Sequence, residues 1–337
     1  MDRGTRLYVW IAMKVENGKL RMETDLIKAE ALRLGFSVCG IAPVGNVGED
    51  AQYLGEWLAI GNQADMNYMK NHFEKRCDPR LVVEGARSIV SVALNYYPKH
   101  LLEEDQYQLA YYAYGRDYHK VMRRKLDALF FFINKELCPV NGRAFCDTAP
   151  VLERYWAWRA GLGRIGKNTQ LIIPKAGSYF FLGELFLDME LEYDTPWQRD
   201  CCGRCTRCLD ACPAKALEQP YRLNARKCIS YLTIENRGTI PDVSAAVLGN
   251  RIYGCDECQK ACPWNHFAVP CDTPELQANP VILQMRKEDW HKLTEKQYDT
   301  LFEGSALKRA KYEGLMRNMD CLTHHADFAT NTKLLSR

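Results

Sequence analysis

The stretch Cys202-Gly-Arg-Cys-Thr-Arg-Cys-Leu-Asp-Ala-Cys-Pro213 decides how this chain is interpreted, because four cysteines recur at short fixed spacings before a proline. The spacing C-x2-C-x2-C-x3-C-P is the ligand run of bacterial-type ferredoxins, in which three thiolates bind one [4Fe–4S] cluster and the fourth binds another. A shorter run of the same kind contains Cys255, Cys258 and Cys262. The pattern predicts a domain that holds two [4Fe–4S] clusters.

The number of thiolates indicates how the ligands divide. Two four-iron clusters need eight thiolates, and the two runs supply seven. If the last cysteine of each run crosses to the other cluster, the first cluster takes Cys202, Cys205, Cys208 and Cys262. The second cluster then takes Cys212, Cys255, Cys258 and one further cysteine. Cys228, between the runs, is the best candidate for that position, and Cys201 and Cys271 are weaker candidates.

A structural zinc site is the main alternative for these cysteines, since zinc sites also use C-x2-C pairs. Zinc sites usually separate their pairs and do not need the interlocked run that ends in proline, so the spacing favours iron–sulfur clusters. Most of the isolated cysteines are expected to be small buried hydrophobic residues. They are Cys39, Cys77, Cys138, Cys146 and Cys321.

Length and composition indicate a globular chain of about two domains. The chain has 337 residues, is 47% hydrophobic and carries a formal net charge of +3, which gives no global argument for nucleic acid but allows local basic patches. Nine of its 15 cysteines lie between Cys201 and Cys262, a pattern that favours metal binding in a reducing compartment over disulfides. No apolar stretch approaches membrane-spanning length, and the apolar residues 7–13 lack the cleavage site of an export signal.

The chain is expected to divide into four parts. Residues 1–21 form an N-terminal extension before Met22, residues 22–195 an α/β or α+β domain, residues 196–275 the cluster domain, and residues 276–337 a C-terminal helical segment. In the second part, helices are expected at 24–34, capped by Thr24, and at about 50–75, 117–136 and about 150–160. Strands are expected at 36–41, 88–94, 107–114 and 143–146, and as a pair at 169–173 and 179–187.

Asp147 lies between an expected strand and an expected helix, directly before Thr148-Ala-Pro150. The residues alone favour a helix cap, since Asp or Thr often precedes a helix whose first turn contains proline. A carboxyl group at the end of a sheet would also suit a proton donor.

Two further motifs are ambiguous or incomplete. Gly161-Leu-Gly-Arg-Ile-Gly-Lys-Asn168 follows a helix, not a strand, so it does not fit a dinucleotide site. It indicates either close approach to a large flat ligand or an ordinary helix end and turn. Asp117-Tyr-His119 begins like the D-x-H-x-x-G signature of one class of cobalamin-binding modules, but Met122 occupies the glycine position. His119 is therefore predicted to be a polar residue at a helix start and not a cobalt ligand.

Several stretches, taken in order with the two cysteine runs, resemble the epoxyqueuosine reductase family. They are Tyr114-Gly-Arg-Asp-Tyr-His-Lys-Val121, Asp147-Thr-Ala-Pro-Val-Leu-Glu-Arg154, Arg159-Ala-Gly-Leu-Gly-Arg-Ile-Gly-Lys-Asn-Thr169, Gly177-Ser-Tyr-Phe-Phe-Leu-Gly-Glu-Leu185 and Cys228-Ile-Ser-Tyr-Leu-Thr-Ile-Glu235. The resemblance covers roughly residues 22–320. It implies an α+β chain in which a nitroreductase-like, cobalamin-binding α/β domain precedes a ferredoxin-like domain with two [4Fe–4S] clusters, an architecture similar to that of cobalamin-dependent reductive dehalogenases.

The resemblance also implies an activity, the reduction of epoxyqueuosine to queuosine at the wobble position of tRNA. The clusters would reduce cobalamin to cob(I)alamin, which opens the epoxide while Asp147 protonates the departing oxygen. It implies that Cys228 completes the second cluster. The expected partners are a tRNA anticodon stem–loop and an unidentified electron donor, and the chain is expected to act as a cytoplasmic monomer without a membrane.

Cofactor and substrate contacts are carried over by motif. The implied cobalamin contacts are Arg76, Asp147, Lys167, Asn168, Leu171, Leu182, Ser230, Cys255 and Asp256. The tRNA-binding candidates are Glu235, Lys120, Arg123 and Arg124, and a second basic cluster lies at Lys308, Arg309, Lys311 and Arg317. Two other classes of function remain open: a corrinoid-dependent reductase of a small molecule, and an iron–sulfur electron carrier, which would need no Asp147.

Overall fold

A four-stranded antiparallel sheet forms the centre of the N-terminal half. The computed structural model describes the backbone of residues 3–335 and the side chains of residues 18–324. The strand order is β1 (Val38–Pro43), β2 (Ser88–Asn95), β7 (Phe180–Leu187) and β4 (Gly142–Phe145), with every neighbouring pair antiparallel. Strand β2 lies inside the sheet and is buried on both faces, as its unbroken apolar and β-branched sequence predicts.

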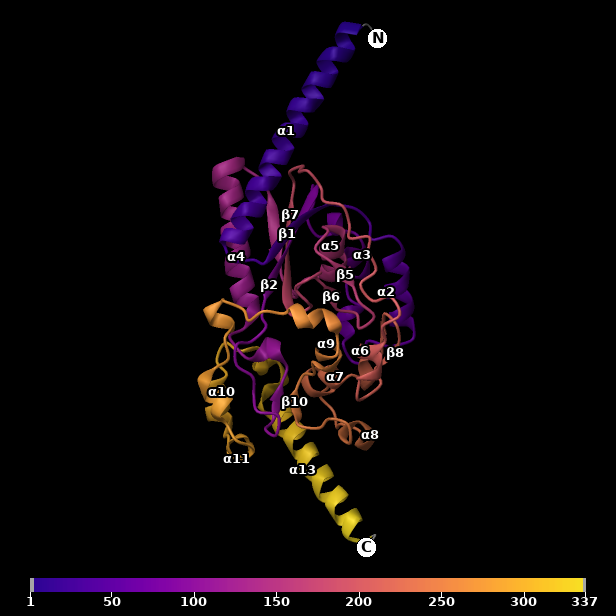
Figure 1. Ribbon diagram of the computed structural model, residues 1–337, viewed down its shortest axis with the longest axis vertical. Coiled ribbons are helices and arrows are strands. Elements are labelled where there is room, and N and C mark those ends of the chain that lie inside the picture. The colour runs from indigo at the N-terminus through magenta and orange to yellow at the C-terminus, as the bar shows by residue number, and fades with distance from the viewer. Residues whose placement is uncertain (1–2, 336–337) are drawn as a thin grey trace.

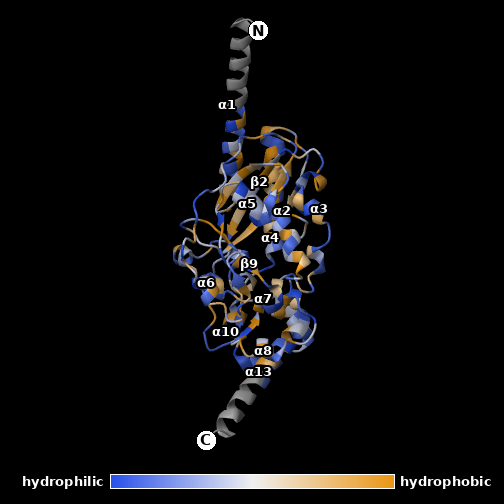
Figure 2. Cartoon of the chain, turned by 90° about the vertical axis from the view of Figure 1, so that its right-hand side faces the viewer, coloured by the Kyte–Doolittle hydropathy of each residue, from blue (hydrophilic) through white to orange (hydrophobic). Residues whose placement is uncertain are grey.

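Helices cover both faces of this sheet (Figure 1). On one face lie α1 (Arg3–Arg33) and α4 (Tyr118–Phe132), and on the other α2 (Glu49–Ala59), α3 (Phe73–Cys77) and α5 (Glu153–Arg159). Leu126 of α4 packs in one core with Val90, while Trp156 of α5 packs in a second core with Phe186. Figure 2 shows hydrophobic residues concentrated on the strands between these helices. The result is the predicted α+β fold.

The cluster segment consists of short elements joined by turns. Its helices are α6 (Arg207–Asp210), α7 (Ile229–Ile234), α8 (Asp242–Ala245) and α9 (Glu257–Lys260), and its strands are β8 (Leu217–Gln219), β9 (Arg222–Leu223) and β10 (Arg251–Tyr253). Strand β10 pairs in parallel with β3 (Gln108–Leu109), which joins this segment to the N-terminal half.

The C-terminal segment is helical, with α10 (Pro280–Gln284), α11 (Lys287–His291), α12 (Glu295–Leu301) and α13 (Lys311–Leu335). Trp290, Phe302 and Leu315 belong to the same core as Val90 of the main sheet. Among the described residues, no helix has the length and apolarity that crossing a membrane requires. The remaining elements are β5 (Arg164–Ile165), β6 (Leu171–Ile172), the π-helical turn η4 (Ile133–Leu137) and the 3₁₀ turns η1 (Asn67–Met69), η2 (Pro79–Leu81), η3 (Tyr111–Ala113), η5 (Ala225–Lys227), η6 (Pro263–Phe267), η7 (Pro274–Leu276) and η8 (Ala306–Ala310).

Four of the expected elements were wrong in extent or pairing. The helix expected at about 50–75 is divided into α2, η1 and α3, with turns between them. Helix α1 begins at Arg3, and Thr24 does not cap it; its hydroxyl donates to the Glu192 carbonyl 3.2 Å away. Of the expected strand 107–114, only β3 forms, and a 3₁₀ turn follows. The expected strand pair 169–187 does not form, because β6 pairs with β5 and β7 joins the main sheet. The domain boundaries remain predictions.

Candidate active site and cluster sites

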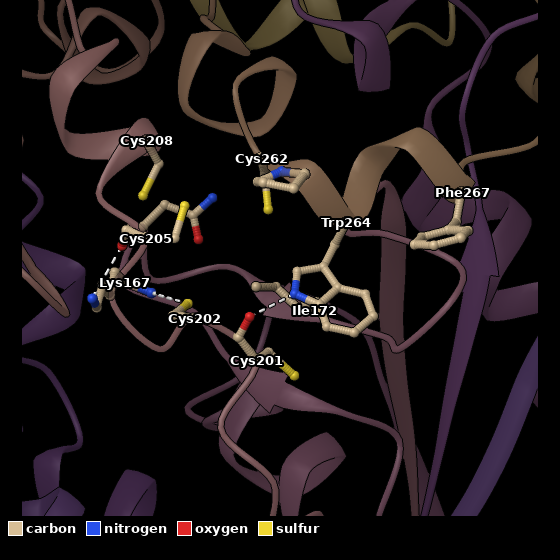
Figure 3. Close-up of a pocket in the computed structure, with 11 residues that line it drawn as sticks. Lys167, Ile172, Cys201, Cys202, Cys205, Cys208, Cys262, Trp264 and Phe267 are labelled. Carbon is tan, nitrogen blue, oxygen red and sulfur yellow. Dashed lines mark hydrogen bonds between the residues drawn. The ribbon is translucent and has the colours of Figure 1, made fainter.

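The cysteines of the expected first cluster line a single cavity of about 340 Å³ (Figure 3). Two of them come from the loop that leads into α6, one lies in α6 itself, and one lies two residues after the end of α9. The four are Cys202, Cys205, Cys208 and Cys262, and Cys201 lines the same cavity. The cavity therefore brings together residues from both cysteine runs, which is the grouping that a crossed arrangement predicts.

Neighbouring segments hold this cysteine loop in place. The Lys167 backbone N–H donates to Cys202 Sγ at 3.4 Å, and the Lys167 Nζ donates to the carbonyls of Gly203 at 2.7 Å and Cys205 at 3.0 Å. The Asp200 carboxylate accepts from the backbone N–H groups of Cys202 and Gly203. Because N–H groups aimed at cluster sulfurs influence reduction potential, Lys167 both fixes the loop and sets the surroundings of its first thiol.

The cysteines of the expected second cluster also lie together. Burial raises the pKa of Cys258 well above its usual range, and the nearby thiols of Cys228, Cys255 and Cys212 raise it further. Cys271 has Lys99 and Asp272 as its charged neighbours, and no cysteine is among them. Buried thiols with raised pKa values become thiolates only if a cation compensates their charge, which iron would do.

The shape of these groups favours a cluster over a single ion. Among the described side chains, no three His, Cys, Asp or Glu residues converge on one point suitable for a metal ion. A zinc ion needs its ligands within about 2.3 Å of one centre. Four cysteines around a cavity of about 340 Å³ instead leave room for an iron–sulfur cube.

Asp147 occupies a strained position directly after β4. Its φ is +56°, in the left-handed region that few residues other than glycine, asparagine and aspartate adopt. Helix α5 begins only at Glu153, with Leu152 as its N-cap residue, so the expectation that Asp147 caps this helix was wrong. Its carboxylate instead accepts a hydrogen bond from the Tyr118 hydroxyl, and its backbone N–H donates to the Glu153 carboxylate.

His119 connects Asp147 to a second carboxylate. Its Nε2 lies 3.4 Å from Asp147 Oδ2, and its Nδ1 lies 2.7 Å from Asp117 Oδ1. Burial works to lower the pKa of His119, but the bonds to both carboxylates outweigh burial and raise that pKa to about 9. The bond from His119 in turn lowers the pKa of Asp147. At neutral pH the Asp147–His119 pair therefore holds one proton between His119 Nε2 and Asp147 Oδ2.

Two further carboxyl groups lie behind Asp147. Burial, together with the Asp147 charge, raises the pKa of Glu153 to about 8. Glu184 is fully buried in β7, its Oε2 has no hydrogen-bond partner, and burial raises its pKa well above the usual range. Tyr118, Glu153 and Glu184 were not predicted as site residues, although each lies inside a stretch that carried the family resemblance.

Tyr68 and Arg76 lie in a polar region together with Asp147 and with Glu235 of the cluster segment. Burial raises the pKa of Tyr68 to about 12, and the charges of Glu235 and Asp147 add to the effect, so these groups lie near one another. Arg76 donates to the Tyr68 carbonyl at 2.9 Å, but its buried Nε has no partner. A buried donor without a partner costs about 1–3 kcal/mol, so this region is suited to a polar ligand.

Comparison with known proteins identifies the family. Residues 76–148 match the family described as "Epoxyqueuosine reductase QueG, DUF1730", and residues 201–265 match the "4Fe-4S double cluster binding domain". An epoxyqueuosine reductase of Cellulophaga algicola is 47% identical over 299 residues, which cover 89% of this chain and 97% of the relative. The chain belongs to the epoxyqueuosine reductase family. It is therefore an oxidoreductase with a double [4Fe–4S] cluster domain.

Other epoxyqueuosine reductases agree with this assignment. The relative of Pseudomonas aeruginosa is 44% identical over 87% of this chain and 82% of its own length. A crystal structure of an epoxyqueuosine reductase with an epoxyqueuosine-modified tRNA-Tyr stem loop matches 89% of this chain and 80% of its own chain, with a TM-score of 0.83 and 30% identity. A second epoxyqueuosine reductase structure, from Bacillus subtilis, has a TM-score of 0.79. The predicted family and ferredoxin-like domain are thus confirmed.

The residues expected to contact cobalamin in this epoxyqueuosine reductase family member fall into two groups. Arg76 and Asp147 belong to the polar region, while the Ser230 side chain, in α7, is hydrogen-bonded to Cys228. The others are already engaged within the protein. Leu171 and Leu182 pack in a core, Lys167 and Asn168 hydrogen-bond residues of the cysteine loops, and Asp256, beside Cys255, accepts from the Tyr111 N–H at 2.8 Å.

The glycine-rich loop is explained by the protein's own backbone. A Cβ on Gly163 would lie 2.1 Å from the Ile172 carbonyl oxygen, and Gly161 has a φ of +78°. The turn interpretation of this loop therefore suffices, and close approach to a flat ligand is not required by these glycines.

The expected tRNA contacts differ in their availability. Lys120 is exposed, whereas Arg123 pairs with Asp127 at 2.9 Å and Arg124 pairs with Glu275. Glu235 forms an ion pair with Arg309 at 2.7 Å. Arg317 of the second basic cluster donates to the carbonyls of Leu232, Asn236 and Gly238, so its side chain stabilises the fold and is not free to bind tRNA.

Proposed function

We propose that this chain reduces epoxyqueuosine to queuosine at the wobble position of a tRNA anticodon. The observation that carries the proposal is the proton-holding pair of Asp147 and His119, which faces Glu235 of the segment that bears the clusters. The overall reaction consumes two electrons and two protons, converts the epoxide to an alkene and releases its oxygen as water. The chain needs an electron path and a proton donor at one site: Asp147 and His119 supply the proton, and the clusters of the cysteine segment would supply the electrons.

Cobalamin is the cofactor that this proposal requires, and the residues present fit it. The orphaned Arg76 Nε, together with the unpartnered Asn62 Nδ2 and Gln63 Oε1, offers buried polar atoms for its side groups. Reduced cobalamin, when bound, supplies a strong nucleophile for opening the epoxide. Arg76 and Ser230 would hold the cofactor, and the thiols of Cys212, Cys228, Cys255 and Cys258 would hold the adjacent cluster.

Asp147 would deliver the proton to the departing oxygen. Its lowered pKa means that Asp147 alone is ionised at neutral pH, so the proton comes from the pair that it forms with His119. Tyr118 orients the carboxylate, and Asp117 orients the imidazole. Glu153 holds the Asp147 backbone in its left-handed conformation.

The direct test uses a stem–loop that carries epoxyqueuosine. Purified protein with iron–sulfur clusters, cobalamin and a chemical reductant should convert the modified base to queuosine, measured by mass spectrometry of the digested nucleosides. The absence of product with both cofactors confirmed present would contradict the proposal.

We further propose that the chain acts in the cytoplasm as a monomer that receives electrons from a separate donor.

Turnover should fall at alkaline pH as His119 loses its proton. The raised pKa of His119 means that the pair keeps its proton below about pH 9 and loses it above. In His119→Asn the remaining acid is the Asp147 carboxyl group, whose pKa is much lower than that of His119. The fall in turnover should therefore begin several pH units lower in this variant. The pH dependence of single-turnover rates measures this. An alkaline limb at the same pH in both proteins would exclude His119 as the proton store.

Binding of the anticodon stem–loop should weaken steeply with salt, because phosphate contacts release counterions. Lys120 is exposed, and among the tRNA candidates it is the one that forms no ion pair in the described chain. Lys120→Ala should therefore lower the slope of log affinity against log salt by about 1. Lys292→Ala, an exposed lysine of the C-terminal segment, is the control and should leave the slope unchanged. Salt-independent binding, or equal turnover of the free nucleoside, would favour a small-molecule reductase.

A further inference from the structure

The cavity of the first cluster reaches the protein surface along an apolar edge. Phe267 lines the cavity beside Trp264 and is nevertheless 52% exposed (Figure 3). Val269, two residues further, is 65% exposed. Exposed apolar side chains that are bordered by polar groups commonly mark interaction surfaces. A cluster in this cavity would have these side chains between it and solvent.

Arginines border this edge on the cysteine loop. Arg199, Arg204 and Arg207 are exposed, and in the described part of the chain none of their guanidinium groups forms a hydrogen bond or ion pair. The acids of the same loop are engaged: Asp200 accepts two backbone N–H groups, and Asp210 accepts the Thr206 hydroxyl at 2.8 Å. The loop therefore presents free positive charge to solvent.

A hydrogen bond joins the charged loop to the apolar edge. Trp264 Nε1 donates to the Cys201 carbonyl at 2.6 Å, so the 3₁₀ turn η6 lies against the loop that carries the arginines. The two features thus form one surface, with apolar side chains beside cations. Transient electron-transfer complexes use interfaces of this kind, which are small and guided by charge.

The second group of cysteines lies against the N-terminal half of the chain. Its neighbours include Asn168 and Tyr111 of the N-terminal half, which contact the Cys258 carbonyl and Asp256 respectively. The first cluster is therefore the one placed to receive electrons from outside.

We propose that Arg199, Arg204, Arg207, Trp264, Phe267 and Val269 form a docking surface for an acidic one-electron carrier protein of the ferredoxin or flavodoxin type. The reduced carrier loses one electron, and the first cluster passes from the [4Fe–4S]²⁺ to the [4Fe–4S]⁺ state, with no bond made or broken. The proposal rests on the proposed function, since it names the source of the electrons for that reaction.

Stopped-flow reduction of the cluster-loaded protein tests the docking surface. A reduced [2Fe–2S] ferredoxin of net negative charge is mixed with wild type, Arg204→Glu/Arg207→Glu or Lys292→Glu/Lys296→Glu, and cluster bleaching is followed. The two variants change the net charge equally, but the control lysines are exposed at the end of α11 and in α12. Figure 1 shows α11 on the other side of the view from α6. At low salt the arginine variant should react about 10–100-fold more slowly, and the difference should shrink at high salt.

Further measurements separate docking from cluster damage. Reduction by dithionite and the iron content should be the same in all three proteins. Arg199→Glu, which lies outside the cysteine run, and Phe267→Ser should each weaken the affinity for the oxidised carrier measured by calorimetry. Equal ferredoxin rates in the arginine and lysine variants would overturn the proposal.

RNA binding by the same arginines is the competing outcome. Loss of stem–loop affinity in Arg204→Glu/Arg207→Glu, with an unchanged ferredoxin rate, would assign the surface to RNA and overturn the proposal. The readout is cluster reduction and not epoxide turnover. Fast, charge-dependent cluster reduction without conversion of epoxyqueuosine would therefore contradict the proposed function and leave the docking surface supported.

Discussion

Cys228→Ala is expected to remove one of the two clusters and abolish epoxide reduction. Two four-iron clusters give about eight iron and eight sulfide per chain, and the loss of one leaves about four of each. Cys228 lies next to Cys212 and Cys258, and it is the fourth thiol of the second group. An interrupted electron path stops turnover even though the proton-donating side is intact. Anaerobic iron and sulfide analysis, with epoxide turnover, measures both effects.

Cys201→Ala is the matched control for this experiment. Cys201 lines the first cavity beside the proposed ligands, but the four others already complete a set. This variant should keep about eight iron per chain. Loss of a cluster in Cys201→Ala with full iron in Cys228→Ala would show that the ligands are assigned wrongly.

Asp147→Asn is expected to lower turnover by about 10²–10⁴-fold, the usual effect of losing a general acid. Asparagine also tolerates the left-handed backbone at this position, and its amide oxygen can still accept from the Tyr118 hydroxyl. It cannot pass on the proton that the carboxylate shares with His119. Single-turnover rates should be measured with iron and cobalamin contents matched to wild type.

The controls for Asp147→Asn are structural. The variant should keep the thermal unfolding midpoint of wild type, because the backbone conformation and the Tyr118 bond persist. Asp105→Asn, at an exposed loop position, should keep wild-type turnover. Near-wild-type turnover in Asp147→Asn would falsify the catalytic role.

The clusters could be predicted from sequence because their ligands are set by local spacing. Three thiolates within seven residues can wrap one cube whatever the rest of the chain does, so Cys202, Cys205 and Cys208 needed no tertiary information. Strand β2 was predicted correctly for a related reason, since a buried strand must be apolar on both faces.

Features that depend on distant partners could not be predicted in this way. The stretch that ends in β7 was assigned to a local hairpin, but it pairs with β2, in a register that joins Ser91 to Glu184, 93 residues apart in the sequence. The residues around Asp147 favoured a helix cap over a proton donor, because the start of α5 at Glu153 is not marked by a capping side chain. Its connection to His119 arises only when α4 packs beside β4 and is invisible in either motif alone.

The crossed grouping of cysteines has a consequence for biosynthesis. A nascent chain that has emerged as far as Cys212 carries three thiols for the first cavity and one for the second, so neither set is complete. Cys262, which completes the first set, emerges 50 residues later in the sequence. The iron-loading machinery of the cell must therefore wait until Cys258 and Cys262 have been synthesised before either set is complete.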